Sequence, residues 1–253
     1  LRLSRGLGDV YKRQDLNNDV IAASGTVSMS GQHNTGATYA ISLSGSTSIT
    51  AGTGVTLESL NDNTGTIALL SSGGIDGGSG TVLMRAANYA FGGADRTITT
   101  TGVLTIEPDA DENSFASSFD NQYLNPVSVT GLTLGKSSNA SAITLSRAIS
   151  LSGPVSIYGG SIDVNANITA NSGNILLDAD TGSTLNQSST GILLDDVITI
   201  ETVTSGNLTL IGRSGDTGSG FDGIDASSAN TTTLRSAGNL LSLIHISEPT
   251  RQP

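Results

Sequence analysis

Short apolar runs recur along almost the whole chain, and each alternates large aliphatic residues with small polar ones. Clear examples are Val55–Leu57 (VTL), Val103–Ile106 (VLTI), Ile143–Leu145 (ITL) and Val155–Ile157 (VSI). A period of two is typical of a β-strand with one buried face, and no segment shows the 3.6-residue stripe of an amphipathic helix. The pattern therefore predicts an all-β protein built from strands of roughly three to five residues.

Nearly every apolar run is bounded by Gly, Asn, Asp or Ser, which tolerate left-handed backbone at corners. Strands this short fit either tandem β-sandwiches or a parallel β-solenoid. A sandwich needs a thick core, commonly anchored by aromatic residues, but only 4% of the chain is aromatic. A solenoid needs only a narrow aliphatic core, because like residues stack on like residues in successive coils. We therefore predict a right-handed parallel β-helix with coils of irregular length.

The same alternating pattern predicts the dimensions of the β-helix and shows where its strands are interrupted. With about 22 residues and about 4.8 Å per coil, residues 15–240 would form roughly ten coils and a rod about 50 Å long. Two stretches break the alternation: 73–80 (GGIDGGSG) and 107–126, which is acidic and holds three aromatic residues. We expect 107–126 to be a loop insertion that projects from the scaffold, where contacts with a partner are most readily made.

The two ends of the chain differ from everything between them. Asp9–Gln14 (DVYKRQ) can be encoded as GAT GTG TAT AAG AGA CAG, and the reverse complement of this DNA encodes LSLIHI, which is Leu241–Ile246. The complementarity continues outward through residues 2–8 and 247–253. Selection on protein structure does not produce complementary codons, whereas a DNA adapter joined to both ends of a fragment does. Both tails also resemble translated sequencing-adapter sequence.

We therefore predict that residues 1–14 and 241–253 are adapter-derived and not native, and that 15–240 is a β-helix repeat fragment. The tails hold five of the 11 Lys and Arg residues and two of the 22 Asp and Glu residues. This leaves 6 basic and 20 acidic side chains, a net charge of about −14, on residues 15–240. So acidic a surface repels phosphate backbones, and we expect no nucleic-acid partner.

Other compositional features narrow the class further. The chain has no cysteine, which excludes a disulfide framework and thiolate metal sites. No run of 18 apolar residues occurs, so we expect no membrane-spanning segment.

One region carries the most characteristic repeats. Gly131–Ala179 reads GLTLGKSSNASAITLSRAISLSGPVSIYGGSIDVNANITANSGNILLDA, and its most typical parts are Gly153–Ala170 and Gly173–Ala179. Thr64–Gly73 and Ser205–Asp216 repeat the theme more weakly. These segments resemble the repeat region of large secreted bacterial adhesins of the filamentous haemagglutinin type and of autotransporter passengers. The resemblance extends over about half of residues 15–240.

The resemblance implies the structural shaft of a secreted or surface-anchored bacterial adhesin or exoprotein, found outside the cell or on its surface. Loops or lateral faces would contact protein or glycan ligands on host cells, other surfaces or neighbouring cells. An outer-membrane secretion partner would export the chain. We expect no enzymatic activity and no cofactor, while the adhesion target and the export route stay open.

The acidic residues allow an alternative hypothesis, a carbohydrate-active β-helix protein that is either a polysaccharide hydrolase or lyase or a binding module. Asp178 with Asp195 or Asp196 on successive coils would supply the pair of carboxylates that hydrolysis requires. Against this hypothesis, only Tyr158 and Arg147 lie nearby to act as an aromatic platform and a basic partner. Corner carboxylates are the simpler interpretation, so we predict no catalytic residue.

Three other motifs are weak. Thr130–Ser137 (TGLTLGKS) departs from a phosphate-binding loop because Gly131 is one position late and a strand is expected to follow, so Lys136 is expected in a solvated turn. Asp15–Asp19 and Gly220–Asp225 lack the spacing of calcium loops. His33 is the only histidine of residues 15–240, which excludes sites that need two. We predict no metal site, and calcium binding by an acidic turn is left open.

Overall fold

The computed structural model describes residues 14–16, 18–32, 39–60, 64–70, 73–179, 190–195, 197–213, 222–226 and 231–245. In this part of the chain the backbone forms 27 strands and no helix. The strands belong to five sheets, and all pairings within them are parallel.

The longest sheet, sheet C, consists of β3 (Val27–Gly31), β6 (Gly54–Ser59), β9 (Thr81–Arg85), β12 (Val103–Glu107), β15 (Gly131–Leu134), β18 (Val155–Tyr158), β21 (Ile175–Ala179), β24 (Leu208–Arg213) and β27 (Leu240–His245). Sheet A consists of β1 (Gln14–Leu16), β4 (Ile41–Leu43), β7 (Thr66–Leu69) and β10 (Asn88–Phe91). Sheet B consists of β2 (Val20–Ala22), β5 (Ile49–Ala51), β8 (Ile75–Asp76), β11 (Arg96–Thr99) and β14 (Leu124–Val127). Sheet D consists of β13 (Phe119–Asp120), β16 (Ala142–Leu145), β19 (Ser161–Val164), β22 (Ile192–Leu194) and β25 (Ile224–Asp225). Sheet E consists of β17 (Ile149–Leu151), β20 (Ile168–Ser172), β23 (Thr199–Ser205) and β26 (Thr233–Arg235).

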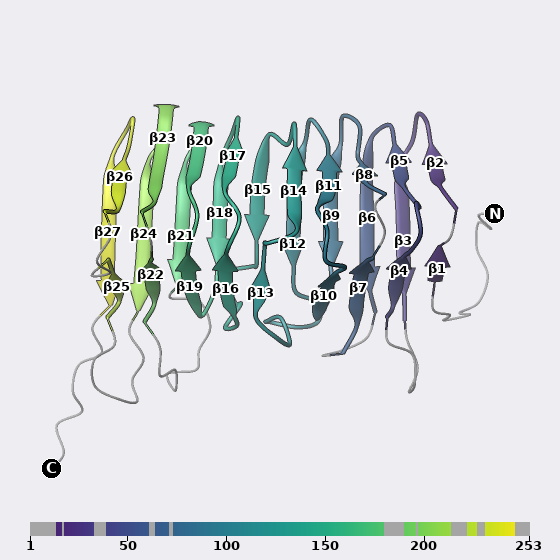
Figure 1. Cartoon of the computed structure of the whole chain (residues 1–253), viewed down its shortest axis with the longest axis horizontal. Helices are drawn as coiled ribbons and strands as arrows, with labels where there is room; N and C mark the ends of the chain where they lie inside the picture. The colour runs from purple at the N-terminus through teal and green to yellow at the C-terminus, as the bar shows by residue number, and fades with distance from the viewer. Residues whose placement is uncertain are drawn as a thin grey trace, which may run out of the picture.

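Three successive strands make one coil, so the described strands form nine coils. The first four coils pass through sheets A, B and C, the fifth through D, B and C, and the last four through D, E and C. The coils lie side by side along the long axis, with the N-terminal coil at the right of Figure 1 and the C-terminal coil at the left. This arrangement is a parallel β-helix and confirms the all-β solenoid predicted from the alternating pattern.

Coil length is irregular, as predicted. The shortest coil runs from Val155 to its aligned partner Ile175, and the longest follows directly, from Ile175 to the aligned Leu208. The predicted number of about ten coils is slightly too high, because most coils are longer than the prediction assumed. At about 4.8 Å per coil, the nine described coils make a rod about 40 Å long.

The core is a narrow column of aliphatic side chains, in which each residue lies on its equivalent in the next coil. Inward and outward positions alternate, so that β12 and β18 bury every second residue. Stacking at equal positions fills the interior without large aromatic residues, which explains why so aliphatic a chain folds. One column of stacked core residues comprises Val27, Val55, Val82, Leu104, Leu132, Val155, Ile175 and Leu208.

Glycine recurs at the corner that precedes sheet C. At Gly206 the backbone has a φ of +112°, and a Cβ atom there would lie 1.9 Å from the carbonyl oxygen of Gly173 in the preceding coil. Only a residue without a side chain fits between two coils that approach this closely.

The segment 107–126 does not project as one loop, contrary to the expectation. It contains β13 and β14, and Phe115, Phe119 and Leu124 are buried in the core. Residues 108–118 and 121–123 lie outside strands. The expectation was wrong because single apolar side chains of this segment pack inward without the alternation of a longer strand. Likewise, 73–80 contains β8.

The predicted tails lie mostly outside the described residues. The exceptions are Gln14 in β1 and residues 241–245 in β27, which pairs with β24 at the end of sheet C. An open parallel edge can pair with any alternating apolar segment, so this pairing has no bearing on the origin of the segment. The described residues also contain no helix that is long and apolar enough to cross a membrane.

Candidate functional site

The main irregularity of the rod is a seam between sheets A and D. Among the strands that the structure describes, sheet A ends at β10, which pairs only with β7, and sheet D begins at β13, which pairs only with β16. No ladder therefore joins β10 to β13, although they belong to consecutive coils. The core between these two strands holds larger side chains than it does elsewhere.

Hydrogen bonds join the two coils at both ends of the seam. At one end the Ala116 amide donates to the Ala87 carbonyl oxygen (2.8 Å), and Ser117 Oγ donates to Asn88 Oδ1 (2.8 Å). At the other end the Arg96 amide of β11 donates to the Tyr123 carbonyl oxygen (2.7 Å). The seam is therefore an opening in one face of the rod, closed at both corners.

An ion pair strengthens the second corner. The Arg147 guanidinium donates two hydrogen bonds to the Asp95 carboxylate, one of them with an Nη2–Oδ2 distance of 2.9 Å. Asp95 lies in the fourth coil and Arg147 in the sixth, so the pair spans the fifth. Asn121 of the fifth coil exchanges hydrogen bonds with the backbone of Arg147. The hydrogen bond from Arg147 lowers the pKa of Asp95 below its ordinary value.

Four aromatic rings fill the seam. Tyr89 and Phe91 on β10 lie nearly parallel, with centroids 6.5 Å apart. Phe115 and Phe119 of the next coil form a second stacked pair at 5.6 Å. The two pairs meet edge to face, with a Tyr89–Phe119 centroid distance of 5.7 Å and an angle of 83°. Edge-to-face contacts place the positive ring edge against the negative ring face, which stabilises this cluster beyond simple burial.

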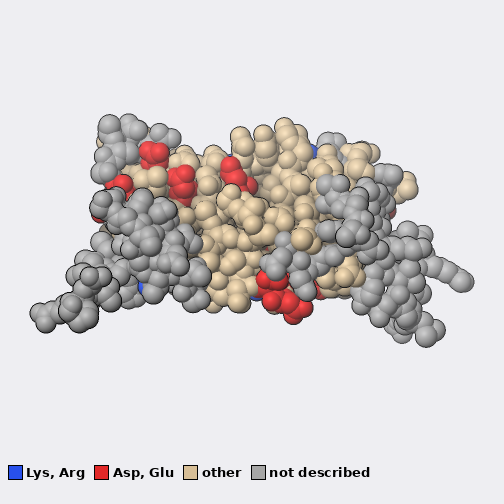
Figure 2. Space-filling view, turned by 90° about the horizontal axis from the view of Figure 1, so that it is seen from below, with Lys and Arg blue, Asp and Glu red and all other residues tan. Residues whose placement is uncertain are grey.

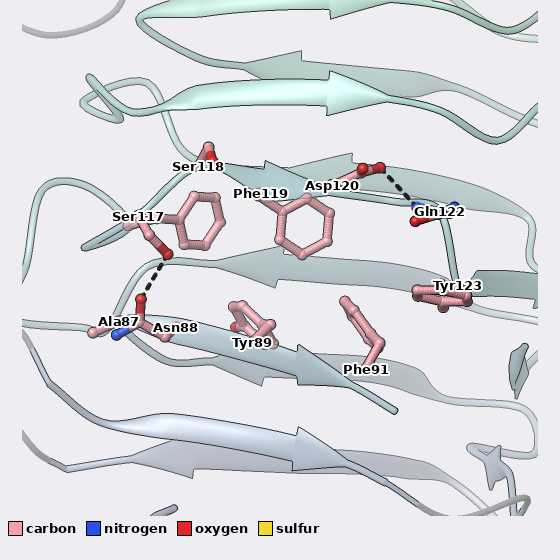
Figure 3. A pocket seen from close by; sticks show the side chains of 11 residues that line it. Ala87, Asn88, Tyr89, Phe91, Ser117, Ser118, Phe119, Asp120, Gln122 and Tyr123 are labelled. Atoms are coloured by element: carbon pink, nitrogen blue, oxygen red, sulfur yellow. Dashed lines mark hydrogen bonds between the residues drawn. The ribbon is translucent and has the colours of Figure 1, made fainter. Parts of the chain in front are cut away.

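A pocket of about 190 Å³ opens beside these rings. In Figure 3 the rings of Tyr89, Phe91 and Phe119 lie along it, with Ser117 near one end and Gln122 and Tyr123 near the other. The residues that line it are Ala87, Asn88, Tyr89, Phe91, Phe115, Ser117, Ser118, Phe119, Asp120, Gln122 and Tyr123.

The lining divides into an apolar floor and a polar rim. Phe115 and Phe119 are each only 4% exposed and belong to the core. Tyr89, Phe91 and Tyr123 are half-buried, and all three line the pocket. Ser117, Ser118, Asp120 and Gln122 on the rim are exposed.

The phenol of Tyr89 is a structural anchor rather than an acid. Its Oη lies 2.8 Å from the Met84 carbonyl oxygen and 2.9 Å from that of Glu107, within donating distance of both. Burial, with a further contribution from the Glu107 charge, raises the pKa of Tyr89 well above its ordinary value. The neutral hydroxyl therefore ties the ring to the corner of sheet C and fixes its orientation.

The pocket has no positive charge. No Lys or Arg lines it, and Asp120 is its only ionisable carboxylate. In Figure 2 most of the described surface is uncharged, and acidic side chains are far more evident than basic ones. The electrostatic field at the pocket therefore disfavours anionic ligands.

The carboxylates of the alternative hypothesis do not meet. Asp178 lies near the end of β21, where sheet C passes into sheet D. Asp195 directly follows β22, where sheet D passes into sheet E. The three residues of β22, about 10 Å long, separate the two corners. Asp196 lies outside the described residues.

The weak motifs lead to structural contacts. Lys136 follows the left-handed Gly135 (φ +76°) and donates from Nζ to the Asp109 carbonyl oxygen (3.1 Å), so it is not the solvated turn residue that was expected. β15 and β16 flank this turn, and no helix follows. Asp19 Oδ1 accepts hydrogen bonds from the amide and hydroxyl of Ser48, both at 2.8 Å, and these lower the pKa of Asp19.

His33, Gly220 and Phe221 lie outside the described residues, whereas Ile224 and Asp225 form β25. Among the residues that are described, no group of three or more His, Cys, Asp or Glu is placed to hold a metal ion.

The sequence-based reasoning did not identify the pocket. Tyr89, Phe91, Phe115, Phe119 and Tyr123 are five of the nine aromatic residues of the chain, and all lie between positions 89 and 123. This local concentration in an otherwise aliphatic chain was the available signal. Three of these residues fall in the predicted loop 107–126 and two precede it, so the prediction did not bring the five together.

Comparisons with protein-family models, with curated proteins and with solved structures find no match to this chain.

Proposed function

We propose that this chain forms part of the structural shaft of a secreted or surface-anchored bacterial adhesin or exoprotein, with a mechanical role and no catalytic one. Sheet C is the observation that supports this most directly, because it continues through all nine described coils. Where sheets A and B end, sheets D and E take over the other two faces. An unbroken ladder keeps successive coils in a constant orientation, which an extended stalk requires.

The repeat segment supports the same proposal. Gly131–Ala179, which resembles adhesin repeats, includes the shortest coil of the rod, from Val155 to the aligned Ile175. The coil before it, from Leu132 to Val155, is also short. The corners of these coils are short, so most of their residues belong to the three strands. Each such coil therefore lengthens the rod with few residues.

The lateral faces and loops would make the adhesive contacts. Ligands on host cells, other surfaces or neighbouring cells would be proteins or glycans, and export would require an outer-membrane secretion partner. Along the outer surface of sheet C, hydroxyl side chains alternate with a few leucines in one aligned row: Ser28, Thr56, Leu83, Thr105, Thr133, Ser156, Leu176 and Thr209.

Adhesion of coated beads tests this proposal. Beads carrying the full chain, and beads carrying an acidic control protein at equal density, are passed over epithelial cells and over glass under shear flow. We expect more beads with the chain to be retained on at least one surface. Retention equal to that of the control on both surfaces would contradict an adhesive role.

Long-read sequencing of the source locus, prepared without the adapter, is the complementary test. A reading frame that continues into further coils with glycine corners supports the shaft. Continuation into a catalytic domain would contradict it. The same reads show whether the codons for residues 1–14 and 241–253 are genomic.

A further inference from the structure

We propose that the seam pocket binds one pyranose ring of a glycan, with the sugar ring packed on the accessible aromatic side chains and its hydroxyl groups bound by the polar rim. The inference rests on the proposed adhesive function for the source of the ligand, a glycan on the surface that the shaft contacts. The binding chemistry itself follows from the pocket.

Not all of the aromatic residues at the seam are needed to fill it. Phe115 and Phe119 are buried and close the gap between β10 and β13. Tyr123 and Phe91, in contrast, keep part of their rings accessible beside the pocket. The C–H groups on one face of a pyranose carry slight positive charge, which matches the negative face of an aromatic ring.

The rim offers hydrogen-bonding groups that the protein does not use itself. Within the described part of the chain, Asn88 Nδ2 and the side-chain amide of Gln122 make no hydrogen bond, whereas Asn88 Oδ1 is occupied by Ser117. Asp120 Oδ1 accepts from the backbone N–H of Gln122 (2.9 Å), and the Asp120 side chain is exposed. Amide and carboxylate groups around an aromatic floor bind several neighbouring hydroxyl groups and fix the orientation of the ligand.

Charge favours a neutral ligand over an ion. The absence of Lys and Arg from the lining disfavours phosphates, sulfates and acidic sugars. A cation would find only the exposed Asp120, one oxygen of which is already engaged. The uncharged donors and acceptors outnumber this one charge, as recognition of a neutral polyol requires.

The small volume of the pocket and the closed ends of the seam exclude larger ligands. The volume of about 190 Å³ lies below the roughly 300 Å³ at which pockets for drug-sized molecules begin. An extended peptide that paired with β10 would have to pass both corners. There the Ala116–Ala87 and Arg96–Tyr123 hydrogen bonds block its path. A single ring that enters from outside avoids this obstacle.

Titration of the full chain with simple glycosides tests the proposal. The probes are methyl β-D-glucopyranoside, methyl β-D-galactopyranoside and methyl α-D-mannopyranoside, with choline chloride as a cationic probe. The chain has no tryptophan, so its intrinsic fluorescence comes from five tyrosines, two of which line the pocket. We expect at least one glycoside to change this fluorescence and to give saturation-transfer NMR signals, with a Kd in about the millimolar range.

Two variants locate the site. Tyr123→Ala removes one accessible ring and Gln122→Ala removes an exposed rim amide, and we expect each to weaken binding by about tenfold. Gln122 is exposed, so its substitution leaves folding intact even if that of Tyr123 does not. The matched control is Tyr158→Ala, which removes a half-buried tyrosine of sheet C outside the pocket and should bind like the wild type.

Each other outcome would overturn the proposal. These outcomes are no response to any glycoside, a response that Gln122→Ala leaves unchanged, and a response to choline alone, which would identify a cation site instead. Failure here would leave the bead assay unaffected, because lateral faces elsewhere can still adhere. Failure of bead adhesion with intact glycoside binding would instead contradict the adhesive shaft and keep the pocket.

Discussion

At the scale of single residues, side chains at the corners hold successive coils together through backbone groups. Asn139 is fully buried, and its Oδ1 accepts from the amides of Phe115 and Ser141. Its Nδ2 donates to the carbonyl oxygens of Tyr158 and Ser141. One amide thus satisfies backbone groups that a corner leaves without a ladder partner, which would be costly to bury unpaired.

The closest approach of two coils at a corner predicts the effect of one methyl group. In Gly206→Ala the new Cβ would lie 1.9 Å from the Gly173 carbonyl oxygen, and the residue would keep a φ of +112°. We expect a loss of about 3 kcal/mol in the free energy of unfolding, measured by urea denaturation with circular dichroism. Gly25→Ala is the control, because no atom lies within 4 Å of its added Cβ. Equal effects of the two substitutions would contradict the steric argument.

The Asp95–Arg147 pair predicts a dependence on pH. The pKa of Asp95 is lowered in the folded chain, so the pair stabilises the fold above the unfolded pKa of about 3.9 and stops doing so as the pH falls through the folded value. We expect Asp95→Asn to have a lower Tm than the wild type at pH 7. The difference should vanish near pH 2. Asp111→Asn removes an exposed carboxylate of the 108–118 loop and is the control for the loss of one negative charge.

At the scale of strands, charged side chains align in register across sheet C. Arg85 on β9 lies between Glu58 on β6 and Glu107 on β12, because all three occupy equivalent positions. Arg85 forms ion pairs with both carboxylates, and its hydrogen bond to Glu107 raises the pKa of Arg85. Opposite charges on adjacent parallel strands support this register, whereas like charges would oppose it.

Removal of the central charge should therefore reduce stability in a way that depends on salt. Arg85→Ala leaves the two glutamates without their shared cation, and we expect a loss of about 1 kcal/mol at low ionic strength, measured by thermal unfolding. Because the side chain is 35% exposed, we expect the loss to shrink in about 1 M NaCl. Arg235→Ala should change little, since that side chain is 70% exposed and lies 3.9 Å from Glu201. An effect of Arg85→Ala that salt does not alter would indicate lost packing instead.

At the scale of the whole molecule, the rod presents an open, apolar surface in its last described coil. Leu240, Leu241 and Leu243 on β27 are between 47% and 51% exposed, and among the described strands β27 pairs with β24 alone. Unpaired backbone groups next to exposed leucines form a surface to which a second copy of the chain can add.

We therefore expect the full chain to associate as its concentration rises, as measured by sedimentation velocity. Lysines at both positions, Leu241→Lys with Leu243→Lys, should reduce this association because charge at an edge disfavours strand pairing. Val203→Lys alters a similarly exposed apolar residue (50%) on sheet E and should leave the association unchanged. A wild-type chain that stays monomeric at high concentration would contradict the prediction.

Alternation of apolar and polar residues was sufficient to predict an all-β solenoid, because each strand, from the short β17 to the longer β23, carries its own burial pattern. Glycine and asparagine likewise marked the corners, since those positions depend on local backbone geometry. The alignment of residues between neighbouring coils was not predictable from the sequence. Thr105, Thr133 and Ser156 share one outer row of sheet C although their spacing in the chain is irregular. Loops of variable length absorb the differences, and only pairing between coils sets the register.

The pocket shows the same division. Residue type and local periodicity are enough to predict the strand class, the aliphatic core, the excess of acidic residues and the concentration of aromatic residues between positions 89 and 123. The end of sheet A at β10, and the meeting of the rings of two coils across the resulting seam, became known only from the packed coils. The tertiary structure also separated Asp178 from Asp195 by the width of sheet D. These outcomes depend on which strands pair, a balance of contacts between residues distant in the chain that no local pattern records.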